Sequence, residues 1–469
     1  MGKYKRLLSN MAILGAGTFT SKVLVFLLMP LYTALLTAEQ FGTADILMQT
    51  ANLLIPLAAL GISEGLFRFA LDTDGDRRKR VFTTALGVII VGIIPLALLI
   101  QLLNFVNIYD GYVWLVLLYV CAANLHSVCA NYIRACDKAR IFALQGIANT
   151  VLTILLNILF LVMFNMGVMG YVLSVAVADI TVTAVLFVAC RLYRHITFKK
   201  PDGALLVAML KFSIPYIPTT LMWTITSASD RFIVTAYAGA AENGLYAAAY
   251  KLPTLISLAG GVFIEAWQFS SVNDAKSEER AKFFENVHKN YMGIMFMGTS
   301  ALVALSKILT ILLLDDSYYS SWKYVPILGM AMLFSAFSAF MGSVYFLEKR
   351  STRSFVTAAA GAIINVVLNF VLIVGMGAIG AAIATVASYA VVYVIRAIDT
   401  KRYLKFKLYP IRIIINTVLL TVQIVLMVAE PPYWIVAQAV AILIMMIING
   451  REIVQSAMTV LRKFLKKSK

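Results

Sequence analysis

The sequence predicts an all-α membrane protein with about 14 transmembrane helices, arranged as two parallel six-helix lobes plus two C-terminal helices. Three observations predict this class. Hydrophobic residues make up 61% of the 469 residues and charged residues only 13%, whereas soluble globular domains contain about 45–50% and about 25%. The apolar residues form runs long enough to cross a bilayer as helices. Basic residues collect in every second connection between these runs.

The apolar runs divide the chain into predicted spans. Because the bilayer offers no water to satisfy backbone polar groups, each run is predicted to be a helix; a β-barrel would need short alternating strands. The basic N-terminus leads into an apolar run without a small-residue cleavage site, which predicts an uncleaved first span. The predicted spans are 9–36, 42–67, 82–103, 113–134, 142–164, 167–190, 209–238, 244–270, 290–314, 323–347, 354–374, 377–398, 411–429 and 433–450.

The distribution of Lys and Arg predicts the orientation. With the N-terminus in the cytoplasm, 35 of the 40 basic residues fall in cytoplasmic connections and termini or at the span ends beside them, Arg396 included. Lys323 falls on the outer side, and four lie deeper within spans. The positive-inside rule therefore predicts a multi-pass protein of the inner membrane with both termini cytoplasmic. This distribution also explains the net charge of +17. No nucleic-acid partner is predicted, because no aromatic-interleaved basic groove or zinc-finger spacing occurs.

An internal repeat relates the two halves of the chain. A shift of 201 residues aligns Glu64 with Glu265 together with the apolar residues before them, and a shift near 210 residues aligns Asn157 with Asn369. Both shifts equal about six spans, an even number, so the two copies have the same orientation. The connecting segments match as well: Ala38–Gly42 resembles Ala241–Gly244, and Met166–Gly170 resembles Met376–Gly380.

The repeat defines four predicted regions. An N-lobe at 1–190 holds spans 1–6, and a C-lobe at 209–400 holds spans 7–12. The basic stretch 191–208 links them in the cytoplasm, and 401–469 contains the two unrepeated spans with a basic cytoplasmic tail.

Several motifs carry a resemblance to a known family. They are the first span with Phe41-Gly42, the stretch Asp230–Ile233 followed by Gly244–Tyr246 and Ala249–Leu252, and Leu368-Asn369 with Gly377 and Gly380. With these the whole chain resembles the polysaccharide and oligosaccharide flippases of the multidrug/oligosaccharidyl-lipid/polysaccharide exporter superfamily. The resemblance implies two six-helix lobes that move undecaprenyl-diphosphate-linked oligosaccharides between leaflets by alternating access. It implies membrane lipids, a polysaccharide polymerase and glycosyltransferases as partners.

Nine ionisable residues lie inside the predicted spans, where charges are costly and usually face a cavity or a partner. Cations lining a wet cavity would replace the hydration of a diphosphate, Arg by a bidentate grip and Lys as a point charge. Lys22, Lys251 and Arg231 are therefore the candidate substrate-binding residues, with a structural ion pair as the alternative for each. In the more distantly similar lipid II flippases, cavity cations lie on the first and eighth spans, as Lys22 and Lys251 do here. The nine residues are Lys22, Asp45, Glu64, Asp179, Asp230, Arg231, Lys251, Glu265 and Lys307.

Four residues are candidates for gating or ion coupling. Glu64 and Glu265 lie near the inner ends of repeat-related spans, and Arg68 follows Glu64 at the spacing of a helical ion pair. They are predicted to form a cytoplasmic gate or to contact the substrate at its entrance. Asp179 is a lone acid near the middle of span 6; it either binds a coupling proton or cation or pairs with a buried base. His126 is predicted to be a packed or hydrogen-bonded histidine.

The predicted function is a lipid-linked oligosaccharide flippase, and two alternatives remain open. A cation-coupled drug or metabolite antiporter of the same superfamily usually has twelve spans and an acid-lined cavity. A membrane-bound polymerase or ligase usually needs a large outward loop, and no outward loop here exceeds about a dozen residues. No enzyme activity, catalytic residue, cofactor or metal is predicted, because no P-loop, nucleophile elbow or zinc motif occurs.

Overall fold

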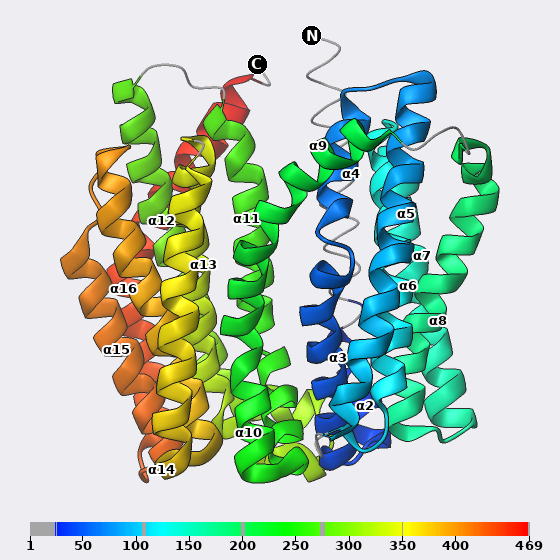
Figure 1. The fold of residues 1–469 in the computed structure, drawn as a ribbon. Helices are drawn as coiled ribbons and strands as arrows, with labels where there is room; N and C mark the ends of the chain where they lie inside the picture. Colours follow the sequence, from blue (N-terminus) through cyan, green and yellow to red (C-terminus); the bar gives the residue numbers. More distant parts are fainter. Residues whose placement is uncertain are drawn as a thin grey trace. The chain divides into compact units, whose positions relative to one another are not determined.

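The computed structural model of the chain describes residues 24, 26–105, 109–197, 202–272, 277–348 and 350–467. Its ordered elements are helical throughout these ranges (Figure 1). The chain divides into two compact units, unit 1 at Met1–Ala247 and unit 2 at Ala248–Lys469. Each unit is described below by itself.

The α-helices and short η segments alternate with brief connections along the whole described chain. Unit 1 contains α2 (Met29–Leu35), α3 (Ala38–Ala58), α4 (Ile62–Leu71), α5 (Gly75–Leu99), η1 (Ile100–Phe105), α6 (Val113–Ala135), α7 (Ala139–Asn157), η3 (Ile158–Met163), α8 (Gly167–Ala189), η4 (Leu192–His195), α9 (Gly203–Ser213), η5 (Ile214–Tyr216) and most of α10 (Ile217–Lys251). Unit 2 contains α11 (Thr254–Val272), α12 (Ser277–Leu313), η6 (Asp316–Lys323), α13 (Val325–Leu347), α14 (Ser351–Asp399), η7 (Thr400–Arg402), α15 (Pro410–Ala429) and α16 (Trp434–Lys467).

The helices reproduce the predicted series of spans. Among the described residues, 9 helices are long and apolar enough to cross a membrane, and the bent pair α3–α4 raises the number to 10. Two of these stretches each hold two predicted spans, because non-helical backbone interrupts α10 at Gly239 and α14 at Gly377. A shorter apolar helix, Trp434–Gly450, opens α16. Most of the first predicted span lies outside the described residues. The predicted all-α membrane fold is confirmed.

Two turns show that the repeat extends to backbone conformation. Gly167 precedes the sixth predicted span and Gly377 the twelfth, and the sequence aligns them. Both adopt positive φ angles, +53° and +56°. Glycine reaches this region without the steric penalty of a Cβ, so both positions suit a sharp turn between antiparallel helices.

The connections of unit 1 gather at two opposite ends, as alternating spans require. At the basic end, the Thr197 backbone N–H donates to Thr83 Oγ1 at 3.0 Å, which ties the segment after α8 to α5. At the other end, Thr43 Oγ1 donates to Asp110 Oδ2 at 3.2 Å, which ties the start of α3 to the connection before α6. Figure 1 shows the helices running between these ends.

Unit 2 is built around α13, because 72% of the residues in its apolar stretch are buried. Aromatic rings of α12 and α14 pack on it, with Tyr291 stacked on Phe340 at 5.4 Å between centroids and Phe337 against Tyr393 at 5.5 Å. The two unrepeated helices join this core through neutral polar groups. Ser300 Oγ donates to Gln423 Oε1 at 2.8 Å, and Gln423 Nε2 donates to Gln438 Oε1 at 3.0 Å.

One basic residue lies elsewhere than the charge count placed it. Arg396 was counted with a cytoplasmic connection, but it lies within α14 and is 2% exposed. Its guanidinium donates to Thr357 Oγ1 and to the Ser338 carbonyl, both at 2.9 Å. Gly342 leaves room for it, because a Cβ there would lie 2.6 Å from Arg396 Nη1. Desolvation of the cation is thus offset by acceptors on neighbouring helices.

Candidate functional site

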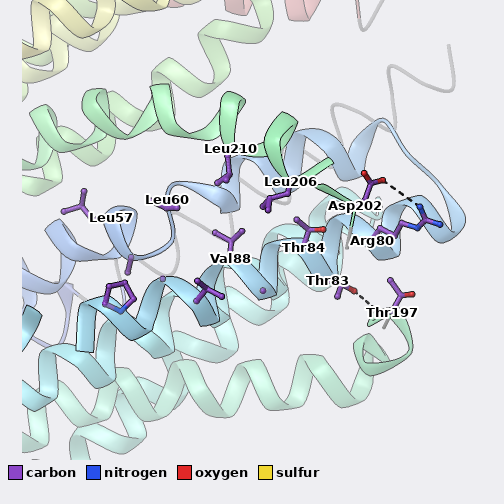
Figure 2. Close-up of a pocket in the computed structure, with 15 residues that line it drawn as sticks. Leu57, Leu60, Arg80, Thr83, Thr84, Val88, Thr197, Asp202, Leu206 and Leu210 are labelled. Atoms are coloured by element: carbon purple, nitrogen blue, oxygen red, sulfur yellow. Dashed lines mark hydrogen bonds and ion pairs between the residues drawn. The ribbon is translucent and has the colours of Figure 1, made fainter. Parts of the chain in front are cut away.

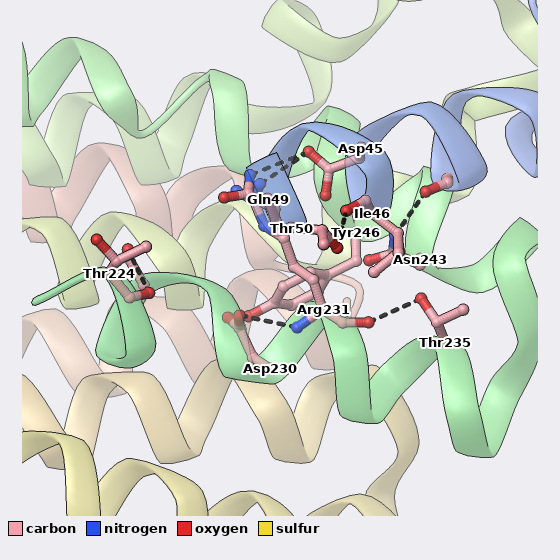
Figure 3. A network of polar contacts seen from close by, with 12 residues as sticks. Asp45, Ile46, Gln49, Thr50, Thr224, Asp230, Arg231, Thr235, Asn243 and Tyr246 are labelled. Atoms are coloured by element: carbon pink, nitrogen blue, oxygen red, sulfur yellow. Dashed lines mark hydrogen bonds and ion pairs between the residues drawn. The ribbon is translucent and has the colours of Figure 1, made fainter. Parts of the chain in front are cut away.

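A buried ion pair joins α3 and α10 inside unit 1 (Figure 3). Arg231 Nη1 donates to Asp45 Oδ1 at 2.8 Å, and each side chain is 5% exposed. The neighbouring Asp230 is also engaged: its Oδ1 accepts from the Arg231 backbone N–H at 2.9 Å, and its Oδ2 accepts from the Tyr246 hydroxyl at 2.6 Å. The network therefore joins α10 to α3 through Arg231, and it ties together the two parts of α10 on either side of Gly239.

The charges in this network do not balance. Two carboxylates, Asp45 and Asp230, share one nearby guanidinium, and Asp230 is fully buried. Asp45 Oδ2 is buried without a hydrogen-bond partner among the described residues. A buried ion pair is strongly coupled because the surroundings screen it weakly, yet an unsatisfied oxygen lowers its net benefit. Such an ion pair joins the two helices while water is excluded, and its opening costs little free energy once water solvates the charges.

Beside the ion pair, two short stretches from the sequence repeat pack at backbone distance. A Cβ on Gly42 would lie 1.9 Å from the Ala240 carbonyl oxygen, and one on Gly244 would lie 1.7 Å from the Ala38 carbonyl oxygen. The contact is reciprocal, because each of the two glycines lies against the backbone of the other stretch. Asn243 Nδ2 closes it by donating to the Gly42 carbonyl at 3.1 Å. Small residues allow membrane helices to approach this closely, so this end of the helix pair is sealed.

A second buried cluster surrounds Asp179 on α8. Asn149 Nδ2 on α7 donates to Asp179 Oδ1 at 2.8 Å, and His126 Nδ1 on α6 lies 3.2 Å from the same oxygen. The other ring nitrogen of His126 lies 2.6 Å from Gln145 Oε1. Three helices of unit 1 thus contribute to one polar centre that contains a His–Asp pair, which can hold or release a proton.

The structure places the remaining predicted residues in different settings. Lys22 lies outside the described residues. Lys251 lies half-buried in the last turn of α10, in unit 2. Glu64 and Arg68 are exposed on α4, and Arg68 Nη1 pairs with Asp72 Oδ2 at 2.8 Å, one turn beyond it. Glu265 lies on α11, and its side chain lies outside the described part.

Lys307, the fourth cation of the predicted spans, has a structural role in unit 2. Its ammonium group forms an ion pair with Glu430. It also lies 4.5 Å from the ring centroids of both Trp322 and Trp434. A carboxylate and two indole faces satisfy the charge through ionic and cation–π contacts. The ion-pair alternative therefore describes Lys307.

Sequence reasoning missed the partners of the two most informative charges. The nearest carboxylate to Arg231 along the chain is Asp230, but neighbours along a helix do not face each other. The actual partner, Asp45, is 186 residues away. The available signal was the match between Ala38–Gly42 and Ala241–Gly244, which marks the two stretches that meet. No comparable signal linked His126 to Asp179.

The fold is that of a multi-span membrane protein with charged side chains buried among its helices. The structure is similar to the lipid II flippase MurJ in an inward closed conformation, with a TM-score of 0.71, 12% identity, and coverage of 95% of this chain and 100% of that one. It is similar to an outward-facing MATE multidrug transporter of the MOP superfamily, with a TM-score of 0.60, 14% identity, and coverage of 84% of this chain and 95% of that one. It is also similar to a MOP superfamily transporter from Pyrococcus furiosus whose binding pocket is described as having reverse polarity. That match has a TM-score of 0.58, 14% identity, and coverage of 84% of this chain and 95% of that one.

The family follows from the sequence. A family model described as polysaccharide biosynthesis protein matches residues 7–267, more than half of the chain. The chain therefore belongs to the polysaccharide biosynthesis protein family. None of the curated proteins matches it significantly in sequence. The family model thus gives the family, and the solved structures give the fold.

Proposed function

We propose that the chain translocates undecaprenyl-diphosphate-linked oligosaccharides across the cytoplasmic membrane, by alternating access, for surface polysaccharide biosynthesis. Family membership supports the substrate class. The observation that carries the mechanism is the reciprocal contact of Gly42 with Ala240 and of Gly244 with Ala38. Two repeat-related helix ends that meet symmetrically form the kind of contact that parallel lobes break and remake when they rock.

In this proposal the Asp45–Arg231 pair latches the sealed end. Asp45 belongs to the predicted N-lobe and Arg231 to the predicted C-lobe, so separation of the lobes there requires the pair to open. The released guanidinium then becomes available to the diphosphate. Lys22 and Lys251 are the proposed cavity cations for the opposite state, and Glu64, Arg68 and Glu265 are the proposed gate at the cytoplasmic end.

Energy is proposed to come from an ion gradient through the Asp179 cluster. The Asp179 carboxylate, hydrogen-bonded to Asn149 and adjacent to His126, is the proposed binding group for one coupling proton. We propose that the protein is a transporter and not an enzyme, that it resides in the inner membrane with both termini cytoplasmic, and that polymerase and glycosyltransferases supply and use its cargo.

The test replaces the proposed cavity cations. In cells that depend on this protein for surface polysaccharide, a Lys22→Ala/Lys251→Ala variant should abolish the polymer while the protein remains inserted at normal levels. Lys323→Ala, at an exposed lysine of η6, is the matched control and should leave the polymer unchanged. Normal polymer in the double variant would contradict the cationic cavity.

A drug or metabolite antiporter is the competing function, and the same purified protein distinguishes the two. In proteoliposomes, the proposed flippase should move a fluorescent polyprenyl-diphosphate oligosaccharide between leaflets and leave cationic dyes in place. Dye export driven by a proton or sodium gradient, without movement of the lipid-linked sugar, would favour the antiporter.

A further inference from the structure

An apolar groove runs along α5 in unit 1, away from the buried ion pair (Figure 2). It has a volume of about 720 Å³ and lies between α5, the break between α3 and α4, and α9. Leu57 and Val91 on its walls are 44% and 67% exposed, so the groove opens to the surroundings of the helix. Arg80 and Pro95 in its lining lie 15 positions apart on α5, about 22 Å of helix, which matches an extended hydrocarbon chain.

Gly87 keeps the middle of the groove open. A Cβ built on Gly87 meets no atom within 4 Å, whereas one on Gly92, also on α5, would lie 2.0 Å from the Ala58 carbonyl oxygen. Gly92 therefore serves packing between α5 and α3. Gly87 has no such packing role, and its missing side chain leaves space that faces the groove.

The basic end of the groove carries one cation and one anion. Arg80 Nη1 and Asp202 Oδ2 lie 3.8 Å apart, beyond hydrogen-bond distance, with side chains 42% and 36% exposed. Arg80 Nε is a buried donor without a hydrogen-bond partner among the described residues. Asp202 uses its other oxygen, Oδ1, to cap α9 by accepting from the Leu205 backbone N–H at 3.0 Å. Each charged group thus keeps capacity for a further partner.

We propose that this groove binds a glycerophospholipid with a primary amine, such as phosphatidylethanolamine. The phosphate accepts from Arg80, the ammonium donates to Asp202, and one acyl chain follows α5 past Gly87 toward Leu57. The order of the lining, charged at one end and apolar beyond, matches the order of groups in such a lipid. The lining of this groove includes neither the Asp45–Arg231 pair nor the Asp179 cluster.

The paired charges select this occupant over other lipids. Phosphatidylglycerol offers a phosphate but no cation for Asp202, whose charge then lies beside the lipid anion. Phosphatidylcholine carries a quaternary ammonium that has no N–H to donate. A polyprenyl diphosphate brings at least two negative charges to a cation that already has an acidic neighbour. Only the primary amine lipid among these satisfies both side chains.

Native mass spectrometry of the full-length protein in detergent, with each lipid added in turn, tests the proposal. Phosphatidylethanolamine should bind the natural protein roughly ten-fold more tightly than phosphatidylcholine, the factor expected from one charge-assisted hydrogen bond. Asp202→Asn should remove this preference, and asparagine still caps α9. Arg80→Gln should weaken binding of both lipids, and Gly87→Phe should block the groove.

Matched variants show whether the effects belong to this groove. Arg77→Gln removes an exposed charge one turn from Arg80, and Gly375→Phe fills open space on α14; both should leave the lipid preference intact. Thermal unfolding identifies variants that fail to fold. Equal binding of the two phospholipids by the natural protein would overturn the proposal. So would a preference for polyprenyl diphosphate or phosphatidylglycerol, or a preference that persists in Asp202→Asn.

Discussion

Units 1 and 2 handle polar groups inside apolar helices in different ways. In unit 1 the buried polar centres are built from ionisable side chains: Asp45 with Arg231, and Asp179 with His126. In unit 2 the helices that have no repeat partner are joined by neutral amides and hydroxyls, with Gln423 bonded to Ser300 and Gln438. The cation Arg396 in unit 2 is held by a hydroxyl and a carbonyl.

The difference separates contacts that can switch from contacts that hold. A buried ion pair responds to water, protons or a charged ligand, because each changes the cost of leaving one partner alone. A network of neutral amides has no charge state to change. The buried ion pairs of unit 1 are therefore the contacts for which we propose switching roles, and we propose that the amide network of unit 2 anchors α15 and α16.

The largest effect is expected at the Asp45–Arg231 pair. Arg231→Gln leaves the Asp45 carboxylate buried without its cation, which should cost about 3–5 kcal/mol of stability. Thermal unfolding of the purified protein in detergent measures this. The double variant Asp45→Asn/Arg231→Gln removes both charges and should recover much of the loss. Arg140→Gln, at an exposed residue, should change little; a similar loss there would remove the distinction between buried and exposed charges.

Packing at the sealed end should give the next largest effect. Gly42→Val and Gly244→Val each place a side chain against a backbone carbonyl and should destabilise the closed contact by about 1–3 kcal/mol. Because the clash exists only while the helix ends meet, labelling of a cysteine introduced at Ala38 should become faster. Gly375→Val, in open space, is the control. Unchanged labelling in both glycine variants would show that this contact does not separate.

The amide network of unit 2 should respond more weakly. Gln423→Leu removes the hydrogen bonds to Ser300 and Gln438, and interhelical hydrogen bonds in membranes are worth about 0.6 kcal/mol on average and at most about 1.7. Thermal unfolding should shift accordingly, and transport should be retained if the network only anchors α15 and α16. Abolished transport by a stable, inserted variant would contradict the contrast between the two units.

The smallest effect is expected from His195, at the basic end of unit 1. Burial lowers the pKa of His195 below its ordinary value of 6.5, and the nearby Lys79, Lys138 and Arg78 lower it further. The unfolded chain then binds more protons near pH 6, so stability is present above pH 6.5 and declines as the pH falls toward the folded-state pKa. His195→Gln should flatten this part of the stability profile. An unchanged slope would assign the pH dependence to other groups.

The spans were predictable because the bilayer imposes local rules. Each helix must be apolar and about 20 residues long, so run length and the position of Gly377 already marked where α14 divides. The charge count placed Arg396 wrongly, because a single buried arginine depends on acceptors that are distant in the sequence, among them Ser338 and Thr357. The pairing of Asp45 with Arg231 and of His126 with Asp179 could not be predicted either, because no sequence periodicity links these residues.

The sequence by itself determined the helical class, the series of spans, the repeat and the family. These follow from composition, length and local backbone chemistry, which act within one segment at a time. Only the tertiary structure decided which buried charges meet, that Gly42 and Gly244 pack reciprocally, and that Arg80 and Asp202 lie together at the end of a groove. Such contacts join residues up to 206 positions apart, and their energy depends on burial and geometry that exist only after the helices have packed.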